Sequence, residues 1–172
     1  MNTDRLNLRL VDINDSADIY NILSNDKVNQ NLNMNKPKDI NDVVELINKY
    51  LKNYLEGTYE PLAITLKDTN EFIGVFLFKL DLYNEDAYEC TIYIDEKFWN
   101  KGFSTELIKS MINYFFTKYK QSNFRGYIMA KNTASARVFE KCNFKLEKIF
   151  KVDGIDGSIL SYLMTREDYN NL

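Results

Sequence analysis

Residues 89–106, ECTIYIDEKFWNKGFSTE, say most about how this chain folds and what it binds. The first half alternates polar and apolar residues as a β-strand does, and an amphipathic helix follows the turn Asn100-Lys101-Gly102. A helix leaves its first backbone N–H groups unpaired, with the positive end of the helix dipole behind them. We therefore expect this strand–turn–helix junction to bind a phosphate or pyrophosphate group.

The hydrophobic pattern on both sides of this junction predicts a mixed α/β fold. Strands are predicted at 5–11, 62–66, 72–80, 88–94, 124–129, 144–152 and 158–165, helices at 12–23, 39–55, 103–119 and 133–142, and a polar loop at 25–37. The strand–helix–strand step over residues 88–129 should be parallel, and the strands joined by short turns antiparallel. We expect an α+β fold with a central, mostly antiparallel sheet of about six to seven strands, a parallel pair in its middle and helices on both faces.

Composition indicates one ordinary globular domain over residues 1–172. Apolar residues make up 45% and charged residues 27% of the chain, and the net charge of −3 argues against binding to nucleic acid. No apolar run reaches the length of a membrane span. With no signal-peptide pattern, Cys90 and Cys142 are interpreted as reduced residues of a cytoplasmic protein.

The chain contains no histidine, and this restricts its chemistry. Without histidine or a close cysteine pair, we expect no metal site. The commonest general base and any Ser–His or Cys–His nucleophile are also absent. In an enzyme of this composition, a carboxylate, a tyrosine, water or the substrate itself must handle protons.

A second motif makes the first one specific to a family. It reads NTAS at residues 132–135 and FEKCNF at 139–144. Together with the segment at 89–106, it resembles the two central motifs of the GNAT N-acetyltransferase superfamily. The predicted order of strands matches that family over essentially the whole chain. Within the superfamily, the chain looks most like the group of ribosomal-protein N-terminal acetyltransferases and spermidine acetyltransferases.

This resemblance implies that the phosphorylated ligand is acetyl-CoA. Its pyrophosphate would lie on the backbone N–H groups of residues 100–105, and its pantetheine arm would pair with the main chain of residues 92–94. An N–H near Ile94 would face the thioester oxygen. The residues that the resemblance places at the cofactor are Ile92, Tyr93, Ile94, Trp99, Asn100, Lys101, Gly102, Phe103, Ser104, Thr105, Asn132, Ser135 and Phe139.

Glu89 is the candidate catalytic residue, because this group often carries a glutamate on the same strand. Amines near neutral pH are mostly protonated, so a base must accept a proton before the amine attacks. By strand parity, Glu89 shares a face with Thr91 and Tyr93. A solvated or ion-paired surface glutamate is the alternative interpretation.

The other assignments have structural alternatives as well. Gly102 can be read as a residue that only ends a turn, and residues 92–94 also fit an ordinary buried strand. Asn132 is a good helix N-cap, and Ser135 could complete that first turn.

Three positions depart from the pattern of the family. Phe139 stands where many members carry a tyrosine that protonates the leaving thiolate, and phenylalanine cannot donate a proton. Asn143 replaces the usual glycine, and asparagine is the next best residue in the left-handed conformation that ends a helix. Trp99 stands where arginine or glutamine is common, although this group often has an aromatic residue there.

These observations predict an N-acetyltransferase in which a primary amine attacks acetyl-CoA directly. The acceptor would be a protein N-terminus or a small amine, bound by the loop at 25–37, the helix at 39–55 and the hairpin at 153–157. The sequence does not identify the acceptor or the oligomeric state, for which a homodimer is the default. The alternatives are a CoA-binding GNAT-fold sensor or interaction protein without turnover, and a scaffold that binds no CoA.

Overall fold

The computed structural model describes residues 2–32, 34–81 and 87–172. Strands β1 to β7 span Leu6–Leu10, Tyr59–Leu66, Phe72–Leu80, Ala87–Ile94, Asn123–Met129, Lys145–Phe150 and Ile159–Thr165. Helices α1 to α6 span Ser16–Ser24, Asp26–Asn29, Ile40–Leu55, Phe103–Lys118, Thr133–Lys141 and Arg166–Asn170, and the 3-10 helices η1 and η2 span Ile13–Asp15 and Glu96–Phe98. The strands and helices predicted from the hydrophobic pattern are found with shifted ends.

The strands are hydrogen-bonded in the order β1-β2-β3-β4-β5-β7-β6. β4 and β5 are parallel, from Ala87 paired with Asn123 to Cys90 paired with Gly126. The β1–β2, β2–β3, β5–β7 and β6–β7 pairs are antiparallel. This topology confirms the predicted mixed α/β fold, with a parallel pair inside a mostly antiparallel sheet.

The chain divides into two compact units, each made of two segments. We call them the N-terminal unit, Met1–Lys79 with Ile92–Phe103, and the C-terminal unit, Leu80–Thr91 with Ser104–Leu172. The boundaries fall within β3, β4 and α4, so each of these elements contributes residues to both units. A single acetyltransferase domain over residues 1–172 stays a prediction.

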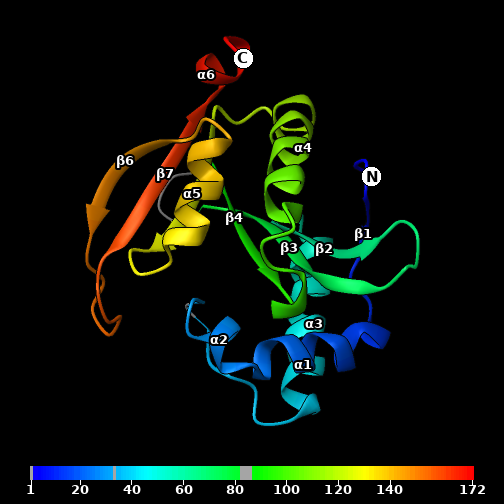
Figure 1. Cartoon of the computed structure of the whole chain (residues 1–172). Helices are drawn as coiled ribbons and strands as arrows, with labels where there is room; N and C mark the ends of the chain where they lie inside the picture. Colours follow the sequence, from blue (N-terminus) through cyan, green and yellow to red (C-terminus); the bar gives the residue numbers. More distant parts are fainter. Residues whose placement is uncertain (1, 33, 82–86) are drawn as a thin grey trace. The chain divides into compact units, whose positions relative to one another are not determined.

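The core of the N-terminal unit lies between its helices and its strands. Figure 1 shows α1, α2 and α3 gathered in one place. Helix α3 begins at the N-cap Asp39, whose carboxylate accepts a hydrogen bond from Asn41 N at 2.7 Å, and it buries Val43, Ile47 and Tyr50. The buried cluster comprises Val11, Ile19, Ile22, Leu23, Val28, Val43, Ile47, Ala63, Val75 and Tyr93.

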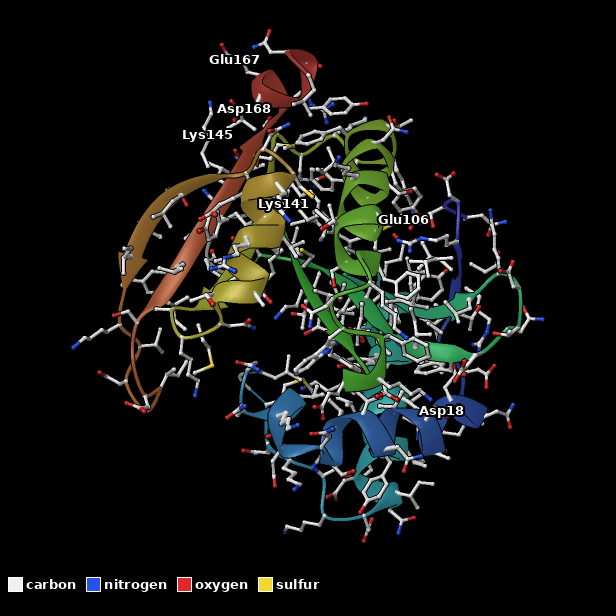
Figure 2. All side chains as sticks on the ribbon, viewed as in Figure 1. Asp18, Glu106, Lys141, Lys145, Glu167 and Asp168 are labelled. Carbon is white, nitrogen blue, oxygen red and sulfur yellow. The ribbon has the colours of Figure 1, made fainter. Side chains whose placement is uncertain are left out.

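The core of the C-terminal unit is rich in aromatic residues. The Phe115 ring of α4 lies 5.0 Å from that of Phe124 on β5, and both side chains are fully buried. The short helix α6 is attached by an ion pair between Lys145 and Asp168, which Figure 2 labels. Asp168 also completes a capping box with Thr165 at the start of α6.

The predicted loop at 25–37 and the predicted start of the second strand differ from the structure. The loop contains the four-residue helix α2, capped by the Asn25 side chain, which accepts from Lys27 N at 2.9 Å. Strand β2 begins at Tyr59, before Pro61. Proline is tolerated there because the last β1–β2 pair is Leu10 with Leu62, so the proline nitrogen does not need to donate a hydrogen bond to β1. The turn expected at residues 84–86 lies outside the described residues.

Candidate active site

The predicted site residues are distributed over both units. The N-terminal unit holds Ile92, Tyr93, Ile94, Trp99, Asn100, Lys101, Gly102 and Phe103. The C-terminal unit holds Glu89, Ser104, Thr105, Asn132, Ser135 and Phe139.

The turn before α4 contains two residues in the left-handed backbone conformation. Asn100 has a φ of 60° and Gly102 a φ of 79°, both in the left-handed region that asparagine and glycine tolerate best. Helix α4 then starts at Phe103. Because the first N–H groups of a helix have no partner inside it, those at the start of α4 are available to an anion.

Trp99 ties this turn to the end of β4. Its indole N–H donates to Ile94 O at 2.8 Å, and its backbone N–H donates to Glu96 O at 3.1 Å. The indole thus holds the backbone at the end of β4.

Arg5 is a residue at this turn that the sequence did not reveal. Its Nη1 donates to Lys101 O at 3.0 Å, and its guanidinium lies 4.4 Å from the centre of the Phe103 ring. A Cβ added to Gly102 would lie 3.5 Å from Arg5 Nη2. The open side of Gly102 therefore faces a guanidinium. No local pattern could have shown this, because Arg5 and Lys101 are 96 residues apart.

The end of β4 presents its peptide groups alternately in opposite directions. Asp95 N donates to Ile73 O at 2.9 Å, and the Tyr93 oxygen lies so close to Gly74 that a Cβ there would come within 2.3 Å of it. The peptide groups of Tyr93 and Asp95 therefore face β3. Those of Ile92 and Ile94 point away from β3, and the Ile94 oxygen already accepts from the Trp99 indole.

The Tyr93 side chain lies in the apolar core of the N-terminal unit. It is 2% exposed, and burial raises the pKa of its hydroxyl well above the usual value. Burial likewise raises the pKa of the nearby Tyr50 to about 12. Both tyrosines therefore stay protonated at neutral pH.

The expected acceptor loop is attached to the 3-10 helix η2. Glu96 of η2 accepts from Asn25 Nδ2 at 3.0 Å and from Lys27 Nζ at 2.5 Å. These hydrogen bonds, that of Lys27 first, lower the pKa of Glu96. Within the loop, Lys36 forms an ion pair with Asp26 at 2.7 Å, so this carboxylate already has a cationic partner.

In the C-terminal unit, Glu89 is half-buried on β4 and lies in register with Arg125 of β5. Residues in register on neighbouring strands project from the same face of a sheet. The β4–β5 pairing ends one residue later, at Cys90 and Gly126. Thr91 and Tyr127 thus lie just beyond the paired stretch of this unit.

A cluster of charged and polar groups accompanies Arg125, and the sequence reasoning missed it. Arg125 Nε and Nη2 donate to the Glu147 carboxylate at 3.2 and 2.9 Å. Ser161 Oγ donates to Glu147 Oε2 at 2.9 Å, and Tyr127 Oη donates to Asp81 Oδ2 at 2.9 Å. Because these residues come from separate strands and the segment after β3, only the strand order brings them together.

Helix α5 begins as predicted. The Asn132 side chain accepts a hydrogen bond from Ser135 N at 3.1 Å, so Asn132 is the N-cap. At the other end of the helix, Asn143 has a φ of 64°, the left-handed conformation expected for the residue after a helix. Cys142 is buried, and its thiol lies 3.7 Å from Thr105 O near the start of α4.

Phe139 is a buried packing residue of α5. It is 3% exposed, and its ring lies 4.8 Å from that of Phe144 and 5.9 Å from that of Tyr162. A Cβ on Gly126 would come within 2.2 Å of this ring, so the glycine makes room for it. The nearby Tyr162 hydroxyl donates to Glu140 at 2.8 Å, and burial raises its pKa to about 12.

Two kinds of feature are absent from residues 2–32, 34–81 and 87–172. None of the helices in these ranges is long and apolar enough to cross a membrane. Among the same residues, no cluster of three or more Cys, Asp or Glu side chains is placed to hold a metal ion.

The parallel β4–α4–β5 step within a mostly antiparallel sheet defines a class of mixed α/β proteins, and comparison with known families makes the class specific. The family described as Acetyltransferase (GNAT) domain matches residues 5–145. The chain therefore belongs to the GNAT acetyltransferase family, and the resemblance inferred from its motifs is confirmed.

Known proteins of this family support the same assignment. The "Uncharacterized N-acetyltransferase YoaA" of Bacillus subtilis (strain 168) is 26% identical over 151 residues, which cover 88% of this chain and 85% of that protein. The enzymes of this family are acetyltransferases, and the homologues carry that name.

Two solved structures correspond to the group predicted from the sequence. One is the ribosomal L7/L12 alpha-N-protein acetyltransferase RimL with coenzyme A, at a TM-score of 0.84 and 17% identity, covering 96% of this chain and 97% of that one. The other is spermidine N-acetyltransferase from Vibrio cholerae with CoA and spermine, at 0.82 and 19%, covering 96% and 98%. At these identities the likeness shows the fold alone.

Proposed function

We propose that this protein transfers the acetyl group of acetyl-CoA to a primary amine. Membership of the acetyltransferase family supports the reaction class. The observation that carries the choice of donor is the turn at residues 100–102, which places left-handed backbone and the Arg5 guanidinium beside the first N–H groups of α4. These features fit a pyrophosphate group.

The pyrophosphate of the donor is proposed to lie on the backbone of residues 100–105. The N–H groups there offer hydrogen bonds without a side chain, and Gly102 lets the phosphate approach closely. Arg5 and the exposed Lys101 add two positive charges at the same turn. Asn132 and Ser135 are proposed to contact the CoA arm, although the structure already gives Asn132 a role as helix cap.

The pantetheine arm is proposed to pair with β4 through Ile92 and Ile94. Their peptide groups point away from β3, whereas the peptide of Tyr93 faces it. The Ile94 oxygen accepts from Trp99, so the Ile94 N–H is the group left to face the thioester oxygen. Tyr93 itself contributes its buried side chain to the core.

Glu89 is proposed as the general base. The amine nitrogen forms a bond to the acetyl carbon while the carbon–sulfur bond breaks, and the proton lost by the amine goes to Glu89, directly or through water. Phe139 has no proton to donate, so water supplies the proton to the leaving thiolate.

The acceptor is proposed to be a protein N-terminus or a small amine. Structures of similar fold include enzymes named for the N-terminus of ribosomal L7/L12 and for spermidine. We place the acceptor against the segment at 25–37, which Asn25 and Lys27 attach to Glu96.

A thiol-release assay with acetyl-CoA tests this function. We expect turnover with at least one member of a panel of peptides, polyamines and aminoglycosides. Glu89→Gln should lower the rate and alter its pH dependence while leaving CoA affinity nearly unchanged. CoA binding without turnover on any amine would favour the sensor alternative, and the absence of a thermal shift with acetyl-CoA would exclude the proposal.

A further inference from the structure

Arg125 is a buried cation, and one of its guanidinium nitrogens lacks a hydrogen bond within the described residues. Its side chain is 9% exposed, and the fork to Glu147 uses Nε and Nη2. The remaining nitrogen, Nη1, is sealed from solvent and makes no hydrogen bond within the described residues. It lies 3.7 Å from Asp81 Oδ2, within the range of an ion pair but too far for a hydrogen bond. A buried N–H without a hydrogen-bond partner destabilises the folded state.

Glu89 shares the sheet face from which Arg125 projects. The two residues are in register on the parallel strands, whereas the neighbouring Gly126 faces Phe139 on the other side. Glu89 also contributes to the raised pKa of Tyr127, after burial and the hydrogen bond to Asp81, so it lies within electrostatic range of this cluster.

The ionisable groups on this face differ in burial. Within the C-terminal unit, they include Arg125 and Tyr127 on β5, Glu89 on β4, Lys145, Glu147 and Lys148 on β6, and Asp81 after β3. Lys145 and Lys148 are exposed, and Lys145 is paired with Asp168. The Arg125 guanidinium, by contrast, is buried beside Glu147 and Asp81. The two hydrogen bonds to Glu147 use Nε and Nη2 of Arg125. The positive charge on the Nη1 side therefore acts on Asp81 and Glu89.

We propose that Arg125 is a positioning residue that keeps Glu89 ionised and oriented for acetyl transfer, with Asp81 opposing it. This inference rests on the proposed role of Glu89 as the base. Glu147 holds the guanidinium plane through two hydrogen bonds, so that the positive charge remains fixed on this face of the sheet. Arg125 and Asp81 therefore have opposite effects on the proton affinity of Glu89.

The test measures the titration of Glu89 directly, without any substrate. The carboxyl carbons of protein labelled with ¹³C-glutamate are followed by NMR against pH, and the Glu89 signal is identified by its loss in Glu89→Gln. Arg125→Gln should raise the midpoint by about one pH unit or more, and Asp81→Asn should lower it. Arg125→Lys keeps the charge and should stay close to the parent protein. Arg137→Gln, which removes an exposed charge from α5, is the matched control.

Opposite shifts in the Arg125 and Asp81 variants would support the inference, and unchanged midpoints in both would overturn it. If Arg125→Gln does not fold, Asp81→Asn decides alone, and the lack of a downward shift is then the overturning result. The proposed function fails separately, through an absence of turnover or through a Glu89→Gln enzyme whose rate keeps the parent pH profile.

Discussion

Replacing Gly102 by alanine distinguishes the cost of backbone strain to folding from a loss of CoA binding. Gly102 has a φ of 79°, and the added Cβ would lie 3.5 Å from Arg5 Nη2, an ordinary contact distance. Nothing in the protein therefore clashes with the methyl group. The cost to folding is the left-handed conformation of a residue with a Cβ, about 1–2 kcal/mol.

Gly57 provides a matched control in the same unit. Its φ is 73°, and no atom lies within 4 Å of the position of its Cβ. Gly57→Ala should therefore lose about the same 1–2 kcal/mol as Gly102→Ala. In a protein of this size, each kcal/mol lowers Tm by about 2–4 °C, so both variants remain folded and measurable.

Only Gly102→Ala should weaken the binding of CoA, because its methyl group would occupy the side from which the phosphate approaches. We expect an affinity loss of about tenfold or more, or about 1.4 kcal/mol. At a CoA concentration of a hundred times the parent Kd, ligand stabilisation should fall from about 2.7 to about 1.4 kcal/mol. Urea unfolding with and without CoA, together with calorimetric titration, measures both quantities.

The reasoning is refuted if the two alanine variants bind CoA with the same affinity as the parent protein. In that case Gly102 would only end a turn, and the turn before α4 would not contact the phosphates of CoA. A loss of affinity in both variants would show that strain in the backbone, and not the phosphate contact, controls binding.

Three further predictions follow from single contacts. Arg5→Gln should weaken CoA binding several-fold in calorimetry, with a smaller difference at high salt, whereas Arg9→Gln, which removes the ion pair with Asp15, should not. Gly126→Ala should destabilise the fold by about 1–3 kcal/mol in urea unfolding, because its Cβ would overlap the Phe139 ring. Adding Phe139→Leu to this variant should recover most of the loss. Additive losses in the double variant would contradict the proposed overlap. The hydrogen bonds from Arg125 lower the pKa of Glu147, so the ionised carboxylate stabilises the fold above its unfolded pKa and stops doing so as the pH falls. In Glu147→Gln, the loss of unfolding free energy between about pH 5 and pH 3 should therefore be smaller than in the parent protein. An unchanged dependence on pH would exclude this contribution.

The local features of the site were predictable because they depend on neighbours in sequence. Asn132 caps α5 and Asn143 ends it in the left-handed conformation, as expected, and Gly102 lies in the predicted turn before α4. Backbone propensity and capping act over a few residues, so a pattern of a few letters is enough to predict them. The short helices α2 and α6 were missed because four or five residues show too little periodicity.

The sequence alone determined the mixed α/β fold, the parallel step through α4, the family and the expected phosphate turn. Only the tertiary structure brought Arg5 to Lys101, Phe139 onto Gly126, and Arg125 between Glu147 and Asp81. Each of these contacts joins separate elements, and its partners depend on strand order and register. Those are set by the packing of the whole chain, because no single segment can bury its apolar face alone.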